Sequence, residues 1–564
     1  MTKLRTLILI ILVAIPALFF GLGRRALWNP VEPRYAGICA ELQSQDTWLV
    51  PTYNRRHFDQ KPALFFWLGA ATLSLAESDT ARLFMVRFPS ALGGLLLVLA
   101  TWVLASELLD RRRGLIAAFL ALTCWISFWS SRFCHMDTLF GASLTWAIFF
   151  ALKGARCKSK VAAFQMTVGL SFCLFLGLML KGPAVIAFLL ATLVAHACLE
   201  RSWSVFVKSR VLWGIPISIV LAAFWVIPAW QTAGNEWANA LLYEAGILHL
   251  FDPTNSPKHG VFYYPSVIMV LLAPWSFFLP ALFTSFWRRR KTAFQGESNG
   301  LRFALAWTIG ILFVLYSGTT YRSRYLIPLV PPFAIFMADF FVHEFQSGKK
   351  RAMPTALGTF TVTLLLTVMG LSFLVPEQYA RWMPSESWSG FFTAVAELPF
   401  TPRICGLFVI VLAIRAFMAV RAERSGLAFG SMILAIVVTF ATWSAYGAPT
   451  MDRLRGDDEL ITAIRSRLDE GRSLVAVEGY ANRESTEGYY YFELGRNLQS
   501  VEEDAESLRK LRIGKPCLLM LRERDLKRIG RSNLDQWQDV CEAPLGRHDV
   551  RLFVNQGTQP KSAR

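Results

Sequence analysis

Uncharged apolar runs recur along nearly the whole chain, and each approaches the length needed to cross a lipid bilayer. A helix needs about 20 apolar residues to span the hydrocarbon core. Inside lipid, every backbone N–H and C=O group must be satisfied within the segment, so such runs fold as helices. The chain is therefore predicted to be a mainly α, polytopic membrane protein with about thirteen transmembrane helices. The runs lie at residues 6–23, 88–106, 114–131, 138–152, 161–180, 182–199, 211–235, 260–287, 303–321, 325–342, 352–376, 404–420 and 427–450.

The composition supports the same class of protein. Of the 564 residues, 54% are hydrophobic and only 17% are charged, whereas globular soluble domains contain about 25% charged residues. The formal net charge of +18 would indicate a nucleic-acid partner in a soluble protein. In a membrane protein, the positive-inside rule explains much of this charge. The bilayer is therefore the expected partner, and nucleic acid is not.

The basic residues of the loops predict how the chain is oriented. With thirteen spans, every cluster of Lys and Arg falls on the side of the N-terminus, which is the cytoplasmic side by the positive-inside rule. Arg24 and Arg25 follow the first span in place of a small-residue cleavage site, so this span is expected to remain as an anchor. The opening loop 24–85 and the tail after residue 450 are then non-cytoplasmic. The clusters lie at residues 111–113, 153–160, 201–210, 288–291, 349–351 and 421–424.

The tail changes character, because its charged residues become more frequent and its apolar runs become shorter. We divide the chain into a transmembrane domain at 1–450, which includes the periplasmic loop 24–85, and a soluble periplasmic α/β domain at 451–564. A unit of this size can form its own core. No motif in it indicates a function. Strands are predicted at 473–480, 489–494, 516–521 and 549–554, and helices at 457–471 and 525–540.

The loop behind the first span concentrates ionisable residues between positions 29 and 61. Pro33 suits the first turn of a helix, and the apolar residues after it recur at helical spacing. This pattern predicts a short helix that lies on the bilayer surface. A solvated, polar connecting loop is the alternative. The apolar face of the helix consists of Tyr35, Ile38, Cys39 and Leu42.

Several ionisable residues stand at the non-cytoplasmic ends of the predicted spans. Such a residue costs about 2.5–3.5 kcal/mol at membrane depth, so its presence calls for a reason. Taken singly, each is explained more simply as a side chain that reaches the headgroups. Together they predict one polar site that opens at the outer membrane surface. The residues that converge there are Glu32, Arg34, Lys61, Asp137, Lys181 and Arg324.

A site with both cations and carboxylates beside lipid suits glycosyl transfer from a lipid phosphate. Lys provides a point charge for phosphate and Arg a planar fork. A carboxylate stabilises positive charge at a sugar carbon. Lys61 and Arg34 would stabilise the charge on the departing phosphate. The chain carries no nucleotide-binding fingerprint, so a lipid-linked sugar is a better donor than a nucleotide sugar.

Short motifs in the first half of the chain follow a known order. EPRYA at 32–36 is followed by DTWLVP at 46–51, QKP at 60–62, the KGP turn at 181–183 and RYLIP at 324–328. In this order and spacing they resemble the membrane glycosyltransferases of the aminoarabinose transferase type, which are related to the protein O-mannosyltransferases. The resemblance extends to about residue 335. It also includes Asp137 and a His-containing loop before FYYP.

The resemblance implies a GT-C fold and a site on the periplasmic face of the bacterial inner membrane. The donor would be a polyprenyl-phosphate sugar, and the acceptor a lipid such as lipid A or another envelope component. Glu32 and Asp137 would act at the reaction centre. The donor phosphate would contact Arg34, Lys61, Arg324 and Tyr325, and the supporting residues would be Tyr35, Asp59 and Lys181.

The chain departs from this family at two positions. Val31 replaces a first-loop aspartate, and Gln60 replaces a glutamate that binds a metal in relatives, with Asp59 one position earlier. A divalent metal, with His259 as a ligand, therefore stays open. The sugar also stays open between an aminoarabinose-like pentose and a hexose. A lipid flippase without chemistry and an inactive lipid-sugar-binding relative are the alternative functions.

Overall fold

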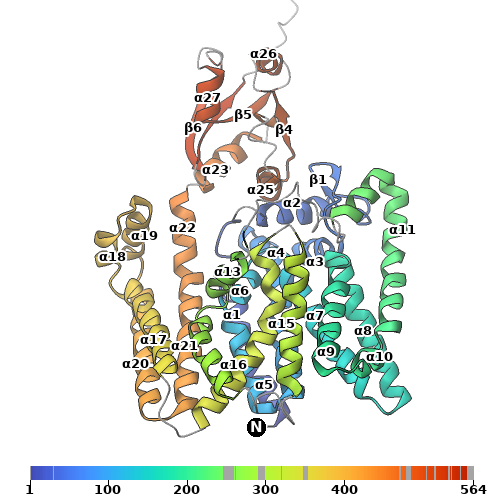
Figure 1. Ribbon diagram of the computed structural model, residues 1–564. Coiled ribbons are helices and arrows are strands. Elements are labelled where there is room, and N and C mark those ends of the chain that lie inside the picture. The colour runs from blue at the N-terminus through green and yellow to red at the C-terminus, as the bar shows by residue number, and fades with distance from the viewer. Residues whose placement is uncertain are drawn as a thin grey trace, which may run out of the picture.

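The protein is a helical bundle with a small α/β unit at one end (Figure 1). The computed structural model describes residues 2–28, 31–244, 260, 262–289, 299–318, 321–346, 353–455, 457–468, 472–477, 484–502, 505–513, 516–530, 534, 537–545 and 548–555.

The bundle consists of helices that follow one another along the chain. They are α1 (Lys3–Phe19), α2 (Glu32–Gln43), α3 (Leu64–Leu73), α4 (Asp79–Leu108), α5 (Arg111–Thr123), α6 (Trp125–Ser131), α7 (Asp137–Arg156), α8 (Lys160–Lys181), α9 (Ala184–Glu200), α10 (Ser204–Lys208), α11 (Val211–Glu244), α13 (Tyr263–Leu271), η2 (Trp275–Phe278), α14 (Leu279–Arg288), α15 (Asn299–Ser317), η4 (Ser323–Leu329), α16 (Val330–Gln346), α17 (Met353–Leu374), α18 (Pro376–Trp382), α19 (Glu386–Ala396), α20 (Thr401–Arg421), α21 (Ser425–Thr442), η5 (Trp443–Gly447) and α22 (Ala448–Arg455). A two-stranded hairpin, β1 (Thr52–Tyr53) and β2 (Arg56–His57), follows α2.

Every predicted apolar run coincides with a helix or a bent pair of helices. Among the described residues, nine helices are long and apolar enough to cross a membrane, and two bent pairs, α5 with α6 and α13 with η2 and α14, pass the same test. The two remaining runs form α1 and α9, which have 17 residues each. The prediction of a polytopic membrane protein is therefore confirmed.

The α/β unit contains a five-stranded sheet with the order β4–β3–β5–β7–β6. Strands β4, β3 and β5 are parallel, whereas β7 runs antiparallel to both β5 and β6. The last bundle helix continues unbroken from Ser425 to Leu454, so the predicted boundary at 450/451 falls within it; the division into domains stays a prediction. The elements are α23 (Asp457–Leu468), β3 (Ser473–Val477), α25 (Glu484–Leu494), β4 (Leu498–Val501), α26 (Ala505–Ile513), β5 (Cys517–Arg522), α27 (Glu523–Ile529), β6 (Gln538–Leu545) and β7 (His548–Val554).

Two predictions in this unit were wrong. The aromatic run 489–494 was predicted as a strand, but it forms the second half of helix α25, which packs against α2. Tertiary contact therefore outweighs the preference of aromatic residues for strands. The helix predicted at 525–540 ends at Ile529, and Gly530 follows with a positive φ of 84°. That conformation favours glycine and stops the helix, and β6 begins at Gln538.

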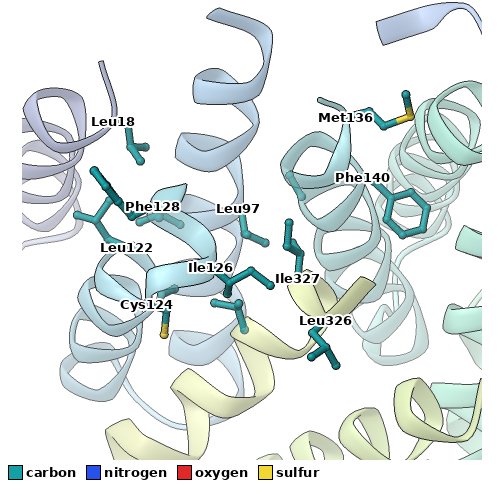
Figure 2. Packing of buried hydrophobic residues seen from close by; sticks show 14 of the residues in the cluster. Leu18, Leu97, Leu122, Cys124, Ile126, Phe128, Met136, Phe140, Leu326 and Ile327 are labelled. Atoms are coloured by element: carbon teal, nitrogen blue, oxygen red, sulfur yellow. The ribbon is translucent and has the colours of Figure 1, made fainter. Parts of the chain in front are cut away.

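Apolar side chains from α1, α4, α5, α6, α7 and η4 meet in the core of the bundle (Figure 2). Helix α7 and η4 approach each other closely, because a Cβ atom on Gly141 would lie 2.6 Å from the Cγ2 atom of Ile327. Ile327 itself is fully buried. This contact fixes η4, which carries Arg324 and Tyr325, against the helix that begins with Asp137.

The predicted first-loop helix exists, but its surroundings were predicted incorrectly. Helix α2 has Pro33 in its first turn and buries the predicted apolar face, as expected. The residues from Glu32 to Leu42 are all buried, however, because α25 of the α/β unit covers the helix on its outer side. The helix therefore does not lie exposed on the bilayer surface, and a short polar sequence could not reveal a partner some 450 positions away.

Basic residues of separate loops meet at the end of the bundle opposite α2. Asp339, near the C-terminal end of α16, pairs with Arg113 of α5 at 3.0 Å and with Arg289 at 3.2 Å. Lys153 and Arg156 at the end of α7 both pair with Glu107 of α4. Where the structure describes them, the loops predicted to be cytoplasmic therefore share one end, and the ionisable residues predicted for the site share the other (Figure 1). Residues 290–291 and 349–351 of the predicted basic clusters lie outside the described residues.

Candidate active site

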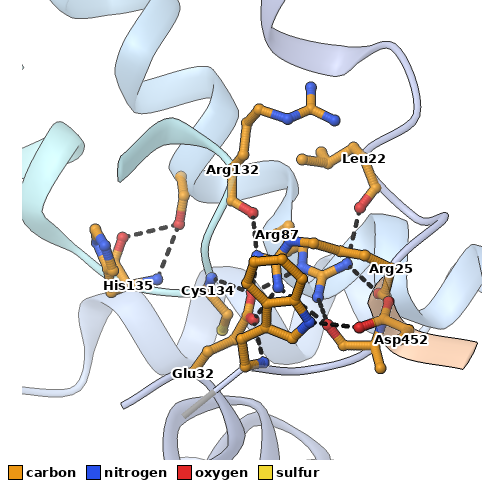
Figure 3. A network of polar contacts seen from close by, with 11 residues as sticks. Leu22, Arg25, Glu32, Arg87, Arg132, Cys134, His135 and Asp452 are labelled. Atoms are coloured by element: carbon orange, nitrogen blue, oxygen red, sulfur yellow. Dashed lines mark hydrogen bonds and ion pairs between the residues drawn. The ribbon is translucent and has the colours of Figure 1, made fainter. Parts of the chain in front are cut away.

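Glu32 lies at the centre of a buried polar cluster (Figure 3). Arg25 donates to both carboxylate oxygens, at 2.7 and 3.0 Å, and Arg87 Nε donates to Oε1 at 2.7 Å. The backbone N–H groups of Trp28 and Cys134 donate to the same carboxylate at 2.8 and 3.0 Å. A carboxylate offers about four lone-pair sites. The fold therefore uses the full acceptor capacity of Glu32.

The charge of Glu32 is stabilised by its two arginine partners. Burial alone would raise the pKa of Glu32, but the charges of Arg25 and Arg87 outweigh burial and lower it from 4.5 to about 2. Burial lowers the pKa of Arg25 to about 10, which leaves its guanidinium charged at neutral pH. The cluster is thus a closed set of ionised groups from which solvent is excluded.

The Glu32 cluster ties together segments that are far apart in the sequence. Arg25 also donates to the backbone oxygen of Arg132 at 2.8 Å. The cluster therefore holds two residues of the α6–α7 turn that are separated by Phe133: Arg132 at its carbonyl and Cys134 at its N–H. Asp452, at the end of the last bundle helix, accepts from the N–H of Ala26 at 2.6 Å. The cluster therefore fixes the turn that leads directly into Asp137.

Asp137 is the second buried carboxylate, and it is the first residue of α7. Lys181, the last residue of α8, donates a hydrogen bond to its Oδ1 atom. The Nδ1 atom of His135 lies 3.2 Å from Oδ2. Burial lowers the pKa of His135, against the opposing effect of Asp137, so this imidazole is neutral at pH 7. The hydroxyl of Ser90 on α4 fixes the backbone of His135, because it accepts from the N–H of His135 at 3.1 Å and donates to the backbone oxygen of His135 at 2.8 Å.

The other predicted site residues on η4 gather around Asp137. The Nζ atom of Lys181 lies 4.9 Å from the ring centre of Tyr325, a distance at which an ammonium group is attracted to an aromatic face. Arg324 is within electrostatic range of Asp137 and of Tyr35 on α2. Burial raises the pKa of the Tyr35 phenol, so it stays protonated. Helices α2, α7, α8 and η4 thus bring five predicted residues together.

Arg34 and Lys61 are linked by Gln60, the first residue of the QKP motif. Arg34 Nη1 donates to the side-chain oxygen of Gln60 at 2.9 Å, and Lys61 Nζ donates to the backbone oxygen of Gln60 at 2.8 Å. Asp59 is half-buried in the same segment. The guanidinium of Arg34 lies 5.5 Å from the ring centre of Tyr35, which connects this pair of cations to the residues around Asp137.

The described residues do not form the metal site that the family resemblance implies. Gln60 stands at the ligand position of a glutamate, and its side-chain oxygen is already an acceptor for Arg34. Within the described ranges, no group of three or more His, Cys, Asp or Glu side chains could hold a metal ion. His259 lies outside the described residues. We therefore derive no chemical step through a metal.

Sequence reasoning missed the partners of Glu32. Arg87 is fully buried at the start of a long apolar stretch in α4, and an ionisable residue in that position is a signal that could have identified it. Arg25 was considered only as a flank of the first span. Asp452 could not have been found, because nothing in its local sequence relates it to residues more than 400 positions earlier.

Comparison with known proteins gives consistent results. Residues 60–230 match a family described as dolichyl-phosphate-mannose-protein mannosyltransferase. An undecaprenyl phosphate-alpha-4-amino-4-deoxy-L-arabinose arabinosyl transferase of Proteus mirabilis is 23% identical over 395 residues, which cover 67% of this chain and 68% of the relative. The corresponding transferase of Yersinia pestis is 24% identical over 399 residues, which cover 67% of this chain and 69% of the relative.

The fold matches that of a solved structure, ArnT from Cupriavidus metallidurans bound to undecaprenyl phosphate. The TM-score is 0.77 at 17% sequence identity, and the match covers 99% of this chain and 100% of that chain. ArnT in the apo state gives a TM-score of 0.75 at 18% identity. The resemblance expected from the motifs and the predicted fold class are therefore confirmed.

Proposed function

We propose that this chain, an ArnT-like protein with the GT-C fold, is a membrane glycosyltransferase that moves a monosaccharide from a polyprenyl-phosphate donor to a lipid acceptor. The observation that carries the proposal is the convergence of cations and one incompletely occupied carboxylate, Asp137, at one end of the bundle. The predicted enzyme class agrees with the names of the relatives, which are arabinosyl and mannosyl transferases.

The residues of the site divide between the donor phosphate and the sugar. We assign the phosphate to Arg34, Lys61, Arg324 and Tyr325, since charge-assisted hydrogen bonds stabilise the negative charge as the phosphate leaves. Asp137 faces the positive charge that develops on the sugar carbon. The acceptor oxygen forms a bond to this carbon while the bond between the carbon and the phosphate oxygen breaks, which inverts the configuration. The departing polyprenyl phosphate takes up the proton that an acceptor hydroxyl loses.

Glu32 receives a different role from the one its motif suggests. Because the fold occupies its lone pairs, Glu32 has no capacity left to accept a proton from a substrate. We assign it the positioning of the turn that carries Asp137. Lys181 sets the charge and orientation of Asp137, and Tyr35 fills the space between Arg34 and η4. Asp59 completes the segment that carries Lys61.

The distribution of loop charge supports a proposal for the orientation in the membrane. The basic residues that the structure describes lie at the end of the bundle opposite the site, and with the positive-inside rule we propose that the site and the α/β unit lie on the periplasmic face of a bacterial inner membrane. The acceptor would be a lipid of the lipid A type or another envelope component on that face. The transferred sugar would be an aminoarabinose-like pentose or a hexose.

The proposal is tested with purified protein and a radiolabelled polyprenyl-phosphate sugar. Wild-type protein should transfer the label to lipid A and release polyprenyl phosphate in equal amount. Lys61→Ala removes a charge-assisted hydrogen bond to phosphate, so the KM for the donor should rise by about one to two orders of magnitude. Lys527→Ala, at an exposed position of α27, is the matched control and should behave as wild type.

Two outcomes would contradict the proposal. Transport of the labelled lipid across vesicles without release of polyprenyl phosphate would favour the flippase alternative. Binding of the donor without transfer to any envelope lipid would favour an inactive relative. Unchanged donor kinetics in the Lys61→Ala variant would remove this residue from the donor site.

A further inference from the structure

Helix α25 of the α/β unit crosses helix α2 at a pair of glycines. A Cβ atom on Gly37 would lie 2.4 Å from the Cα atom of Gly488, and a Cβ atom on Gly488 would lie 2.5 Å from the backbone oxygen of Pro33 and 2.7 Å from the Cα atom of Arg34. All of these neighbours are backbone atoms, which cannot rotate away as a side chain can. The two helices therefore approach this closely only because both positions are glycine.

Hydrogen bonds surround the crossing on both sides. The N–H of Gly488 donates to the hydroxyl of Tyr53 at 3.1 Å, and the hydroxyls of Ser44 and Tyr491 lie 2.8 Å apart. Asn54 donates to the Glu487 carboxylate at 2.8 Å. The contact is thus a specific docking of the α/β unit on α2 and on the hairpin that follows it. Further bonds join Arg55 to Asn497 and Arg82 to the backbone oxygen of Phe492.

The hairpin is itself built for this contact. Asn54 and Arg55 have positive φ angles of 50° and 63°, which side-chain-bearing residues rarely adopt. The Glu41 carboxylate of α2 stabilises this turn, because it accepts from the N–H groups of both residues at 2.8 and 2.7 Å. Both side chains of the turn then reach the α/β unit. Helix α2, the hairpin and α25 therefore form one connected unit.

The position of the crossing relates it to the donor site. Gly488 lies against Pro33 and Arg34, in the first turn of α2. On its other side, Arg34 donates to Gln60, which also holds Lys61. A displacement of the α2 backbone at this point would move the Arg34 guanidinium away from Gln60 and Lys61.

We propose that the α/β unit is a working part of the donor site, because the crossing of Gly488 on α2 sets the position of Arg34. Gly488 and Gly37 are positioning residues; they do not contact the substrate themselves. The proposal rests on the proposed function, in which Arg34 binds the donor phosphate. It gives the C-terminal unit, whose sequence indicates no function, a role in donor binding.

The test is Gly488→Ala in the full-length, purified protein, with undecaprenyl phosphate as the probe. The added methyl group must push the α2 backbone away, and a shift of this kind can cost about a hundredfold in a positioned site. We expect the Kd for undecaprenyl phosphate and the donor KM to rise by about tenfold or more, with the acceptor KM unchanged. Gly390→Ala in α19, where a Cβ atom would meet nothing within 4 Å, is the matched control.

Two further variants test whether the effect of Gly488→Ala is only a general loss of folding. Gly37→Ala pushes the same two backbones apart, so the double variant with Gly488→Ala should weaken donor binding by less than the product of the single effects. Tyr53→Phe removes the hydroxyl that accepts from the N–H of Gly488 and should weaken donor binding by about two- to fivefold. A purely structural effect would lower the folded fraction and leave the Kd of the folded protein unchanged.

The outcomes separate this proposal from the function on which it rests. If the wild-type protein neither binds undecaprenyl phosphate nor transfers sugar, the proposed function fails and this proposal fails with it. If the wild-type protein does both and folded Gly488→Ala keeps the wild-type Kd, only the role of the α/β unit is overturned.

Discussion

Two buried carboxylates lie at the end of the bundle that carries α2, and their surroundings differ. Glu32 is enclosed by two guanidinium groups and two backbone N–H groups, and its side chain is 0% exposed. Asp137 is contacted by the ammonium of Lys181 and the imidazole of His135, on side chains that are 13% and 10% exposed. The first carboxylate is saturated by the fold, and the second keeps partners that can rearrange.

The difference teaches how to separate a structural acid from a chemical one. Guanidinium groups are planar and bind a carboxylate in a fixed geometry, whereas an ammonium is a point charge on a flexible stem. A carboxylate that must respond to a sugar with developing charge needs partners of the second kind. Burial does not distinguish the two acids, because both are buried. They differ in their partners and in how many of their acceptor positions the protein itself occupies.

The largest effect is expected for Glu32→Gln. Breaking a buried ion pair by removing one partner costs about 3–5 kcal/mol, because Arg25 and Arg87 would keep buried charges without a counter-ion. The thermal unfolding temperature in detergent should fall steeply, while the fraction that remains folded keeps a turnover within about tenfold of wild type. Normal thermal stability together with lost turnover would restore Glu32 to the reaction centre, as its motif suggests.

Asp137→Asn should show the opposite pattern. The amide retains the shape of the side chain but not its charge, so turnover should fall by about 10²–10³-fold, the usual cost of removing one electrostatic stabiliser of a transition state. The Kd for undecaprenyl phosphate should stay within a few-fold of wild type. Glu506→Gln, which alters an exposed pair with Lys510 on α26, is the control. If Asp137→Asn kept the wild-type turnover, Asp137 would not act in the reaction, and the proposed difference between the two acids would be wrong.

Acid should unfold the protein partly through Glu32. The folded-state pKa of about 2 lies below the ordinary value of 4.5, so the ionised carboxylate contributes stability above pH 4.5 that is lost as the pH falls toward 2. The shift corresponds to about 3 kcal/mol over this whole window. The difference in unfolding temperature between wild type and Glu32→Gln should therefore narrow on acidification. A constant difference from pH 7 to pH 3 would show that the charge of Glu32 contributes little.

Most of the fold and part of the candidate site could be predicted from the sequence. Hydropathy located all nine helices and both bent pairs that, among the described residues, are long and apolar enough to cross a membrane, because backbone groups in lipid must be satisfied within the helix. The sequence also predicted that Arg34, Lys61, Asp137 and Arg324 lie at the same end of the bundle, because the basic loops indicate which end of each span faces which side. What stayed hidden depends on contacts between distant residues, namely the saturation of Glu32 by Arg25 and Arg87.

The C-terminal unit shows the same limit of local reasoning. Three strands and one helix were found from apolar runs and helical spacing, but the run 489–494 was assigned to the wrong type of element. Its aromatic residues favour a strand locally, but in the fold they belong to a helix that packs against α2. A contact that joins residues 37 and 488 leaves no trace in either local sequence.

The most direct test of the account is a cryo-EM structure of the wild-type protein with undecaprenyl phosphate. The account predicts that the phosphate lies within hydrogen-bond distance of Lys61 and near Arg34, Arg324 and Tyr325, with the Glu32 cluster unchanged. A phosphate bound by Arg25 and Arg87 in place of Glu32, or at the opposite end of the bundle, would contradict it.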